Sequence, residues 1–476
     1  MTRTRKQWVR PATVREDRWE LRSFDYLWSA VPNVPVVYDF AAVLDAGKLR
    51  AGLALALDRF PPFAGRVRSR RGRLSIVLAG EGMGVPFEEC EGGDVYPSGQ
   101  KCHIFPHEPY YDFGPVLSVK LRRSRHGGCT LSIGWVHVAS DASSMIEFLQ
   151  SWSHYCGGSA ALPPAPVLDR ALPAALEHLP DARAVRAARF TPAQLLSAVP
   201  QVARSVLCDP VLDVRVTTES LKRLKKRVAE GLDKDEWVST TEVLFGLISQ
   251  ALVSADGRGP EGGDLVGRWC VNTRGRGSLT PPGFVGNGLN LLTTTTPVTP
   301  QPRGDAPGAL ESLRRVTLAM HAQLRECIAD PAKVDACTTL LEQGLRTGQL
   351  AGYVNRMCWT KPYCETITEP RRTIFNSWTA FDWFRGLDFG AGQTPTHLRV
   401  APYWTHRQYY FVTPFDAAGE EISIRVHMRP AHVGTFVDHL RQAGLVFRDC
   451  SVVRNRRRTK AASFKGAEGA ITPAAS

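Results

Sequence analysis

One histidine in this sequence combines the residue type and the surroundings that acid–base chemistry needs. His137 ends the run Cys129–His137, in which apolar and small residues alternate, and Asp141 follows four positions later. Such alternation predicts a strand, so we expect His137 at the end of a buried strand, just before a turn. An imidazole in apolar surroundings with access to solvent can act as a general base. The alternative is a core histidine for which Asp141 is only a hydrogen-bond partner. The His-x-x-x-Asp spacing occurs once in this chain and is a weak signal by itself, so this alternative stays open.

A second segment carries arginines that could bind charge. It reads Asn272-Thr-Arg274-Gly-Arg276, and a loop rich in proline and glycine follows and ends at Asn287. If a strand continues through the two arginines, they point to opposite sides, and the inward one requires an acidic partner. A pair of surface arginines on a hairpin is the alternative.

A third segment lies near the C-terminus, where residues 388–392 read Asp-Phe-Gly-Ala-Gly and follow Ser377-Trp-Thr379. The Asp-Phe-Gly triplet is equally typical of a glycine turn between two strands. The sequence excludes a protein kinase, because it has no glycine-rich loop with its lysine and no His-Arg-Asp loop.

The elements that must hold these residues follow from apolar periodicity and from proline and glycine stop signals. Helices are expected at 44–60, 220–230, 240–253 and 310–328, and another from Ser144, which has a capping-box spacing to Glu147. Strands are expected at 116–120, 129–137 and 265–272 and at the start of 293–308. An Ala- and Pro-rich crossover at 160–212 predicts an N-terminal domain at 1–195, a C-terminal domain at 213–450 and a basic disordered tail at 451–476.

Composition narrows the class of protein. The chain has 476 residues, 43% of them hydrophobic and 22% charged, as in globular proteins. Of its net charge of +13, residues 1–10 carry +4 and residues 451–476 carry +5. This distribution argues against a nucleic-acid-binding face. Eleven cysteines without a Cys-x-x-Cys pair argue against a disulfide scaffold or a zinc site and favour a reducing compartment. Without a secretory signal or a membrane-spanning apolar run, we expect a cytoplasmic protein.

In this order, the motifs resemble those of the BAHD family of acyl-CoA-dependent acyltransferases. That family has His-x-x-x-Asp, then a strand with Asn/Asp-x-Arg-x-Arg, then Tyr/Phe-x-Gly-Asn, and finally Asp-Phe-Gly-Trp-Gly. The matching segments here are His137–Asp141, Asn272–Arg276, Phe284–Asn287 and Asp388–Gly392. The resemblance covers roughly residues 8–448.

The resemblance implies an α/β protein of two chloramphenicol-acetyltransferase-like domains with the active-site channel between them. It implies a monomer that moves an acyl group, other than an amino-acyl group, from acyl-CoA to a hydroxyl or amine of a small molecule by direct attack. Acyl-CoA is then a co-substrate, and no cofactor, metal or nucleic acid is expected.

The resemblance also assigns roles to individual residues. His137 is the implied base. The implied structural and channel-shaping residues are Asp141, Arg274, Asp388, Phe389 and Gly390. The implied contacts to the thioester, its oxyanion or the loop at the interface are Ser377, Thr379 and Asn287.

The sequence departs from the family pattern at three motif positions. Val136 precedes the histidine, where a second histidine is common, and Ala142 follows the aspartate, where glycine is usual. Ala391 replaces the tryptophan of the last motif, which has been considered an oxyanion contact, so the oxyanion donor stays open. Two alternatives therefore stand beside the acyl-CoA transferase. They are a condensation-type enzyme that uses carrier-protein thioesters and a catalytically inactive binding protein of the same fold.

Overall fold

The structure of the chain is a computed structural model. It describes residues 4–13, 17–26, 28, 34–70, 73–78, 83–92, 114–124, 127–159, 161–169, 182–187, 193, 196, 200–201, 204, 209–230, 232–233, 236–256, 263–299, 308–348, 369, 371–400 and 408–453.

The N-terminal half of the described chain is built on a mixed sheet of six strands. Their order is β1 (Arg5–Val9), β6 (Val85–Glu91), β7 (Leu117–Arg123), β8 (Cys129–Trp135), β3 (Val34–Phe40) and β13 (His397–Val400). Strand β8 lies inside this sheet, and all seven of its residues are buried. The predicted strands at 116–120 and 129–137 are thus confirmed, except that β8 ends two residues before His137.

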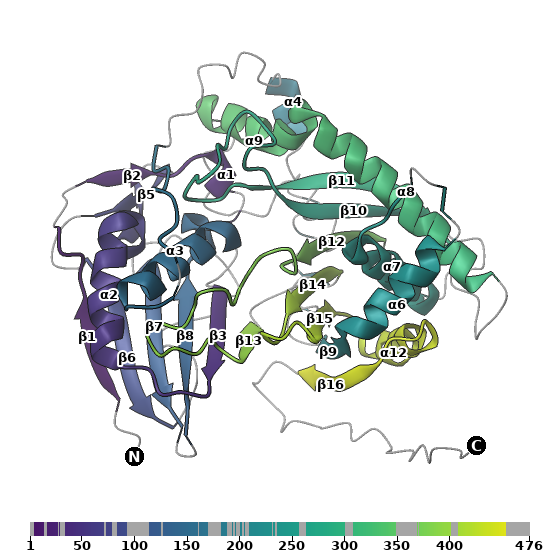
Figure 1. Ribbon diagram of the computed structural model, residues 1–476. Coiled ribbons are helices and arrows are strands. Elements are labelled where there is room, and N and C mark those ends of the chain that lie inside the picture. The colour runs from purple at the N-terminus through teal and green to yellow at the C-terminus, as the bar shows by residue number, and fades with distance from the viewer. Residues whose placement is uncertain are drawn as a thin grey trace, which may run out of the picture.

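Helices α2 (Ala46–Arg59) and α3 (Ala142–Tyr155) pack together against this sheet (Figure 1). Helix α2 follows the prediction closely, because Asp45 caps its first turn and prolines end it at the 3-10 turn η1 (Pro61–Ala64). Helix α3 begins earlier than predicted. Its N-cap is Asp141, whose carboxylate accepts from the Ser144 amide at 3.1 Å, so the capping-box assignment to Ser144 was wrong.

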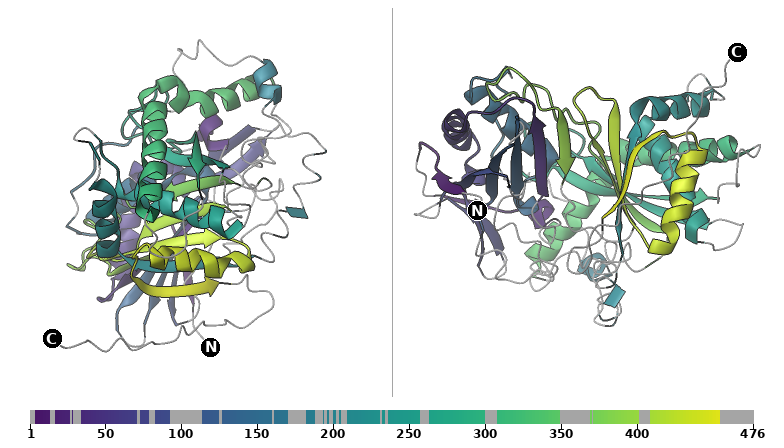
Figure 2. Two further views of the ribbon diagram at one scale, coloured as in Figure 1. Left: turned by 90° about the vertical axis from the view of Figure 1, so that its right-hand side faces the viewer. Right: turned by 90° about the horizontal axis from the view of Figure 1, so that it is seen from below.

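The C-terminal half contains a second mixed sheet of seven described strands. Their order is β11 (Leu289–Val298), β10 (Gly263–Asn272), β12 (Arg372–Ser377), β14 (Tyr409–Pro414), β15 (Glu421–His427), β9 (Val211–Thr217) and β16 (Phe447–Val453). Its helices are α6 (Thr218–Ala229), α7 (Thr240–Asp256), α8 (Ala309–Ala329) and α12 (Val433–Gln442). They pack against one another beside this sheet and enclose a second core (Figure 2). The predicted helices at 220–230, 240–253 and 310–328 are confirmed.

Smaller elements complete the described chain. They are the three-stranded sheet β2 (Arg18–Glu20), β5 (Arg73–Val77) and β4 (Arg66–Arg70), the helices α1 (Ser23–Tyr26), α4 (Ala182–Ala187) and α9 (Pro331–Arg346), and the 3-10 turns η3 (His137–Ala139) and η4 (Pro430–His432). Within the described ranges, no helix is both long and apolar enough to cross a bilayer.

Two elements tie the halves together. Strand β13 belongs by sequence to the predicted C-terminal domain, yet it pairs antiparallel with β3, and Arg399 Nε donates to Asp39 Oδ2 at 2.8 Å. Helix α9 contacts α1 on one side and β11 on the other. Residues that pair across 360 positions leave no local pattern, so the sequence could not reveal that β13 joins the first sheet.

Two predicted segments coincide only partly with the described residues. Strand β16 continues through Ser451–Val453 and pairs with β9, so the first three residues of the predicted tail belong to a strand. Residues 454–476 and most of the crossover at 160–212 lie outside the described residues.

Candidate active site

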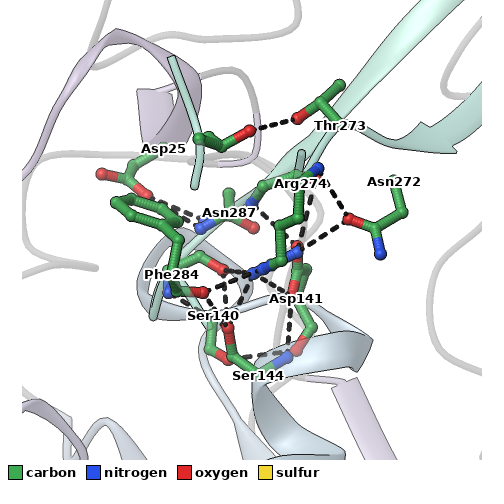
Figure 3. Close-up of polar contacts among 12 residues, drawn as sticks. Asp25, Ser140, Asp141, Ser144, Asn272, Thr273, Arg274, Phe284 and Asn287 are labelled. Carbon is green, nitrogen blue, oxygen red and sulfur yellow. Dashed lines mark hydrogen bonds and ion pairs between the residues drawn. The ribbon is translucent and has the colours of Figure 1, made fainter. Parts of the chain in front are cut away.

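The two halves meet at a buried ion pair between Asp141 and Arg274. Arg274 Nη1 lies 2.8 Å from Asp141 Oδ2, and Nη2 lies 3.0 Å from Oδ1, so two parallel hydrogen bonds join the side chains (Figure 3). Both side chains are at most 5% exposed. The inward arginine expected from the sequence therefore has its acidic partner. Strand β10 nevertheless ends at Asn272, so Arg274 lies in a turn instead of a continuing strand, and Arg276 is exposed.

Arg274 also organises the loop that follows it. Its Nε donates to the carbonyl oxygen of Phe284 at 2.9 Å, and Nη2 donates to the carbonyl oxygen of Gly286 at 3.0 Å and to Ser144 Oγ at 2.8 Å. Asp141 Oδ2 in turn accepts from the amide of Gly288 at 2.8 Å. A buried guanidinium is tolerated when its donors are satisfied, and these contacts fix the loop on the start of α3.

His137 opens the 3-10 turn η3, between the end of β8 and the start of α3. Its ring stacks on the indole of Trp28, with centroids 4.7 Å apart and planes 15° from parallel. Burial lowers the pKa of His137 below its ordinary value, although its own backbone, Asp141 and Asn287 act in the opposite direction. Part of the residue's surface still reaches solvent. The imidazole is therefore held neutral near neutral pH while remaining accessible.

Asn287 determines which nitrogen of His137 carries the proton. Its Nδ2 lies 3.0 Å from Asp25 Oδ1, 2.9 Å from the carbonyl oxygen of His137 and 3.2 Å from that of Val138. All three are acceptors, so this end of the side chain must be the NH₂ group. Asn287 Oδ1 then faces His137 Nδ1 at 3.1 Å and can only accept. In the neutral ring, Nδ1 therefore holds the hydrogen and Nε2 has a free lone pair.

Ser377 and Thr379 flank Trp378, which packs at the end of β8. Their hydroxyl groups are 2.8 Å apart and hydrogen-bond to each other. Between them, Trp378 is buried and stacks on Trp135, the last residue of β8, with centroids 6.5 Å apart. Among the described contacts, none joins either hydroxyl to His137.

The Asp-Phe-Gly segment lies at the other end of α3. Both carboxylate oxygens of Asp388 accept from the amide of Ser159, and the amide of Phe389 donates to Ser153 Oγ at 2.9 Å. Helix α3 has 14 residues, so about 20 Å separate its two ends. The structure therefore places this segment away from His137, and the expectation that it shapes a channel has no contact in the described chain to support it.

The position of this segment also answers the question raised by Ala391. Ala391 follows Gly390 and packs on the first core, and its amide donates to the carbonyl oxygen of Asp388. A tryptophan at this position would sit near the C-terminal end of α3. Its replacement by alanine therefore does not remove an oxyanion donor from the surroundings of His137.

The comparison with known families decides the classification. The sequence pattern of the Transferase family matches residues 1–443. The chain belongs to this family. The BAHD resemblance read from the motifs is thus confirmed over nearly the whole length.

Relatives within the family act on different acceptors. The chain is 30% identical to hydroxycinnamoyl-CoA:5-hydroxyanthranilate N-hydroxycinnamoyltransferase of Avena sativa, over 53% of this chain and 59% of that protein. It is 27% identical to shikimate O-hydroxycinnamoyltransferase of Nicotiana tabacum, over 57% of this chain and 66% of that protein. In each case, the match spans less than two thirds of the relative's length.

A solved structure has the same fold. The crystal structure of F. graminearum TRI101 complexed with coenzyme A and T-2 mycotoxin superposes with a TM-score of 0.63 at 15% identity, covering 88% of this chain and 96% of that one. The expected two-domain α/β fold of this BAHD family member is therefore confirmed.

Two site residues of this BAHD family member could not be found from the sequence pattern. Asp25 and Trp28 come from the N-terminal segment, where no spacing marks them as chemical. Asn287 was expected at the interface, but its orientation toward His137 was not. Within the described residues, no cluster of three or more His, Cys, Asp or Glu side chains could hold a metal ion.

Proposed function

We propose that this protein transfers an acyl group from an acyl-CoA thioester directly to a hydroxyl or amine of a small molecule, with His137 as the general base. The observation that carries the proposal is the contact between His137 Nδ1 and Asn287 Oδ1, because it leaves Nε2 free to accept a proton. A lowered pKa keeps that nitrogen unprotonated at neutral pH. Placing a neutral base within reach of the acceptor is the requirement of general base catalysis.

In the proposed reaction, the acceptor O–H or N–H gives its proton to Nε2 while its oxygen or nitrogen attacks the thioester carbonyl carbon. The tetrahedral intermediate then collapses, the C–S bond breaks, and the coenzyme A sulfur takes the proton from Nε2. No covalent enzyme intermediate is required. The two hydroxyl groups of Ser377 and Thr379 are the proposed contacts to the thioester or its oxyanion, since the residue between them, Trp378, stacks on Trp135 at the end of β8.

Asp141 and Arg274 are proposed to hold the base without taking part in proton transfer. Both oxygens of Asp141 are engaged with Arg274 and with backbone amides, so the carboxylate is not directed at the imidazole. Such a pair fixes the start of α3, and with it the turn that carries His137, against the loop at 284–288.

The donor and acceptor classes are supported by the relatives. The name of the Avena sativa relative specifies hydroxycinnamoyl-CoA and an amine, and that of the Nicotiana tabacum relative specifies a hydroxycinnamoyl group and an oxygen. We therefore propose an aromatic acyl-CoA as the donor. An alcohol and an amine acceptor remain to be separated by experiment.

The test is a coenzyme A release screen with purified protein, aromatic and aliphatic acyl-CoAs, and a library of alcohols and amines. The blank for each pair is the His137→Ala protein, which corrects for spontaneous thioester hydrolysis. We expect acceptor-dependent release and intersecting double-reciprocal plots, because both substrates must be bound before chemistry. Parallel plots with an acylated enzyme would contradict direct attack. Acyl transfer only from carrier-protein thioesters, offered as separate donors and followed by the acylated product, would favour the condensation-type alternative, and no transfer from any donor would favour the binding protein.

A further inference from the structure

Asp25 is a buried carboxylate far in sequence from the other site residues. It lies in the one-turn helix α1 and is 0% exposed. Its Oδ2 accepts from the amide of Arg22 at 2.8 Å, and its Oδ1 faces Asn287 Nδ2 at 3.0 Å and the Asn287 amide nitrogen at 3.4 Å (Figure 3). A carboxylate removed from water must be compensated by donors, and Asn287 supplies two of the donors seen here.

The partners of Asn287 differ in what holds them in place. Two acceptors of its Nδ2 group are the carbonyl oxygens of His137 and Val138, which belong to the same turn as the imidazole. They move together with the base. Asp25 is the acceptor that comes from a different part of the chain, and its helix packs against α9 and η3. Asp25 therefore fixes the amide relative to the scaffold as well as to the turn.

A rotated Asn287 amide would be costly because of these contacts. Turning the group by 180° would place its oxygen against the Asp25 carboxylate and two carbonyl oxygens, and its NH₂ group would face His137 Nδ1. The imidazole would then have to accept at Nδ1 and carry its hydrogen on Nε2. That tautomer cannot take a proton from the acceptor through Nε2.

The same segment also restrains the plane of the imidazole. Trp28 follows Asp25 by three positions, is 6% exposed, and stacks on the His137 ring. The N-terminal segment thus meets the base twice, once through the amide and once through the ring face. Neither contact involves Nε2, because Asn287 contacts Nδ1 and Trp28 contacts the face of the ring.

We infer that Asp25 is a positioning residue for this reaction: by holding the Asn287 amide in one orientation, it keeps the hydrogen of His137 on Nδ1 and leaves Nε2 free. The inference rests on the proposed function, in which Nε2 is the base. It adds a carboxylate that acts through another side chain and touches neither substrate.

The measurement is the tautomer of His137, read from the ¹⁵N shifts of its two ring nitrogens in protein labelled on histidine. The His137→Ala protein identifies its signals among the 12 histidines. In the unmodified protein, we expect hydrogen on Nδ1. In Asp25→Asn, an NH₂ group must face either the Arg22 amide or Asn287, so one of the two donors loses its acceptor. We expect a mixture of tautomers and a loss in kcat of about 10–100-fold, the range for residues that orient a metal-binding imidazole, with KM little changed.

The matched control is Asp213→Asn, in the second sheet, which removes a carboxylate paired with Arg425. It should lower the melting temperature without altering the His137 tautomer or kcat. Hydrogen on Nε2 in the unmodified protein would overturn the inference even if Asp25→Asn failed to fold. An unchanged tautomer in folded Asp25→Asn would overturn it as well, with the proposed function intact. The expected tautomers in a protein that releases no coenzyme A would instead overturn the proposed function and leave only the control of the His137 tautomer by Asp25.

Discussion

The two ends of helix α3 carry two family motifs that do different work. At the N-terminal end, Asp141 caps the helix and pairs with Arg274, and His137 lies in the turn just before it. At the C-terminal end, Asp388 and Gly390 pack against the last turn and the residues after it. The first end combines buried charge with an accessible imidazole, whereas the second is held by backbone hydrogen bonds and close packing.

The polarity of a helix gives a physical reason for this difference. Its first turn leaves amide groups that need acceptors, and a carboxylate at the cap satisfies them while still reaching a cation from another domain. Its last turn leaves carbonyl groups that allow a close approach of glycine, and the Asp388 carboxylate at this end is held by the backbone amides of Ser159 and Gly390. The motif at the N-terminal end of α3 can therefore join the two halves through an ion pair. The motif at the C-terminal end joins them through close packing. The following predictions test that contrast.

The largest expected effect is on activity at the N-terminal end. His137→Ala should lower kcat/KM by about 10²–10⁴-fold, the range for loss of a general base, with an unchanged circular dichroism spectrum. The matched control is His154→Ala, since His154 lies in the last turn of the same helix. It should keep nearly the parental rate. Equal losses in both variants would remove the functional distinction between the two ends.

The next effect is on stability at the same end. Asp141→Ala and Arg274→Ala should each lower the free energy of unfolding by about 3–5 kcal/mol, because each leaves a buried charge without its partner. Chemical denaturation of the two single variants and the double variant measures the coupling. The double variant should lose less than the sum of the single losses. Strictly additive losses would show that the pair does not connect the halves.

A smaller effect on stability is expected at the C-terminal end. Gly390 has φ of 76°, and a Cβ there would lie 2.4 Å from the carbonyl oxygen of Cys156. Gly392 has φ of 70°, but a Cβ there meets no atom within 4 Å. Both alanine variants should lose about 1–3 kcal/mol from backbone strain, and Gly390→Ala should lose more because of the added clash. Equal falls in the melting temperatures of the two variants would contradict close packing of Gly390 against Cys156.

The smallest effect is on the pH dependence of the rate. Because burial lowers the pKa of His137, the active neutral form persists below the ordinary histidine value of about 6.5. The rate should therefore be flat through neutral pH and fall only on further acidification, as Nε2 becomes protonated. The profile of kcat/KM against pH tests this, with Gly390→Ala as the reference. An inflection above 6.5, or one that shifts in Gly390→Ala, would contradict the separation of the two ends.

Much of the secondary structure was readable from the sequence because local periodicity reports burial on one face. The alternation in Cys129–His137 and the apolar spacing at 44–60 and 310–328 each gave an element close to the observed one. The boundaries that failed are those set by a distant partner. Asp141 became the cap of α3 where Ser144 was expected, whereas β10 ends at Asn272 as expected.

The sequence by itself determined the family, the residue types of the proposed base and of the ion pair, and the order of the strands and helices around them. These are properties of composition, spacing and periodicity along the chain. Only the tertiary structure decided that Asp25 and Trp28 meet His137, that Asn287 sets its tautomer, and that the Asp-Phe-Gly segment lies a helix length away. Those facts depend on contacts between residues as many as 262 positions apart, and hydrogen-bond geometry across such separations is created only when the two sheets and their helices close on each other.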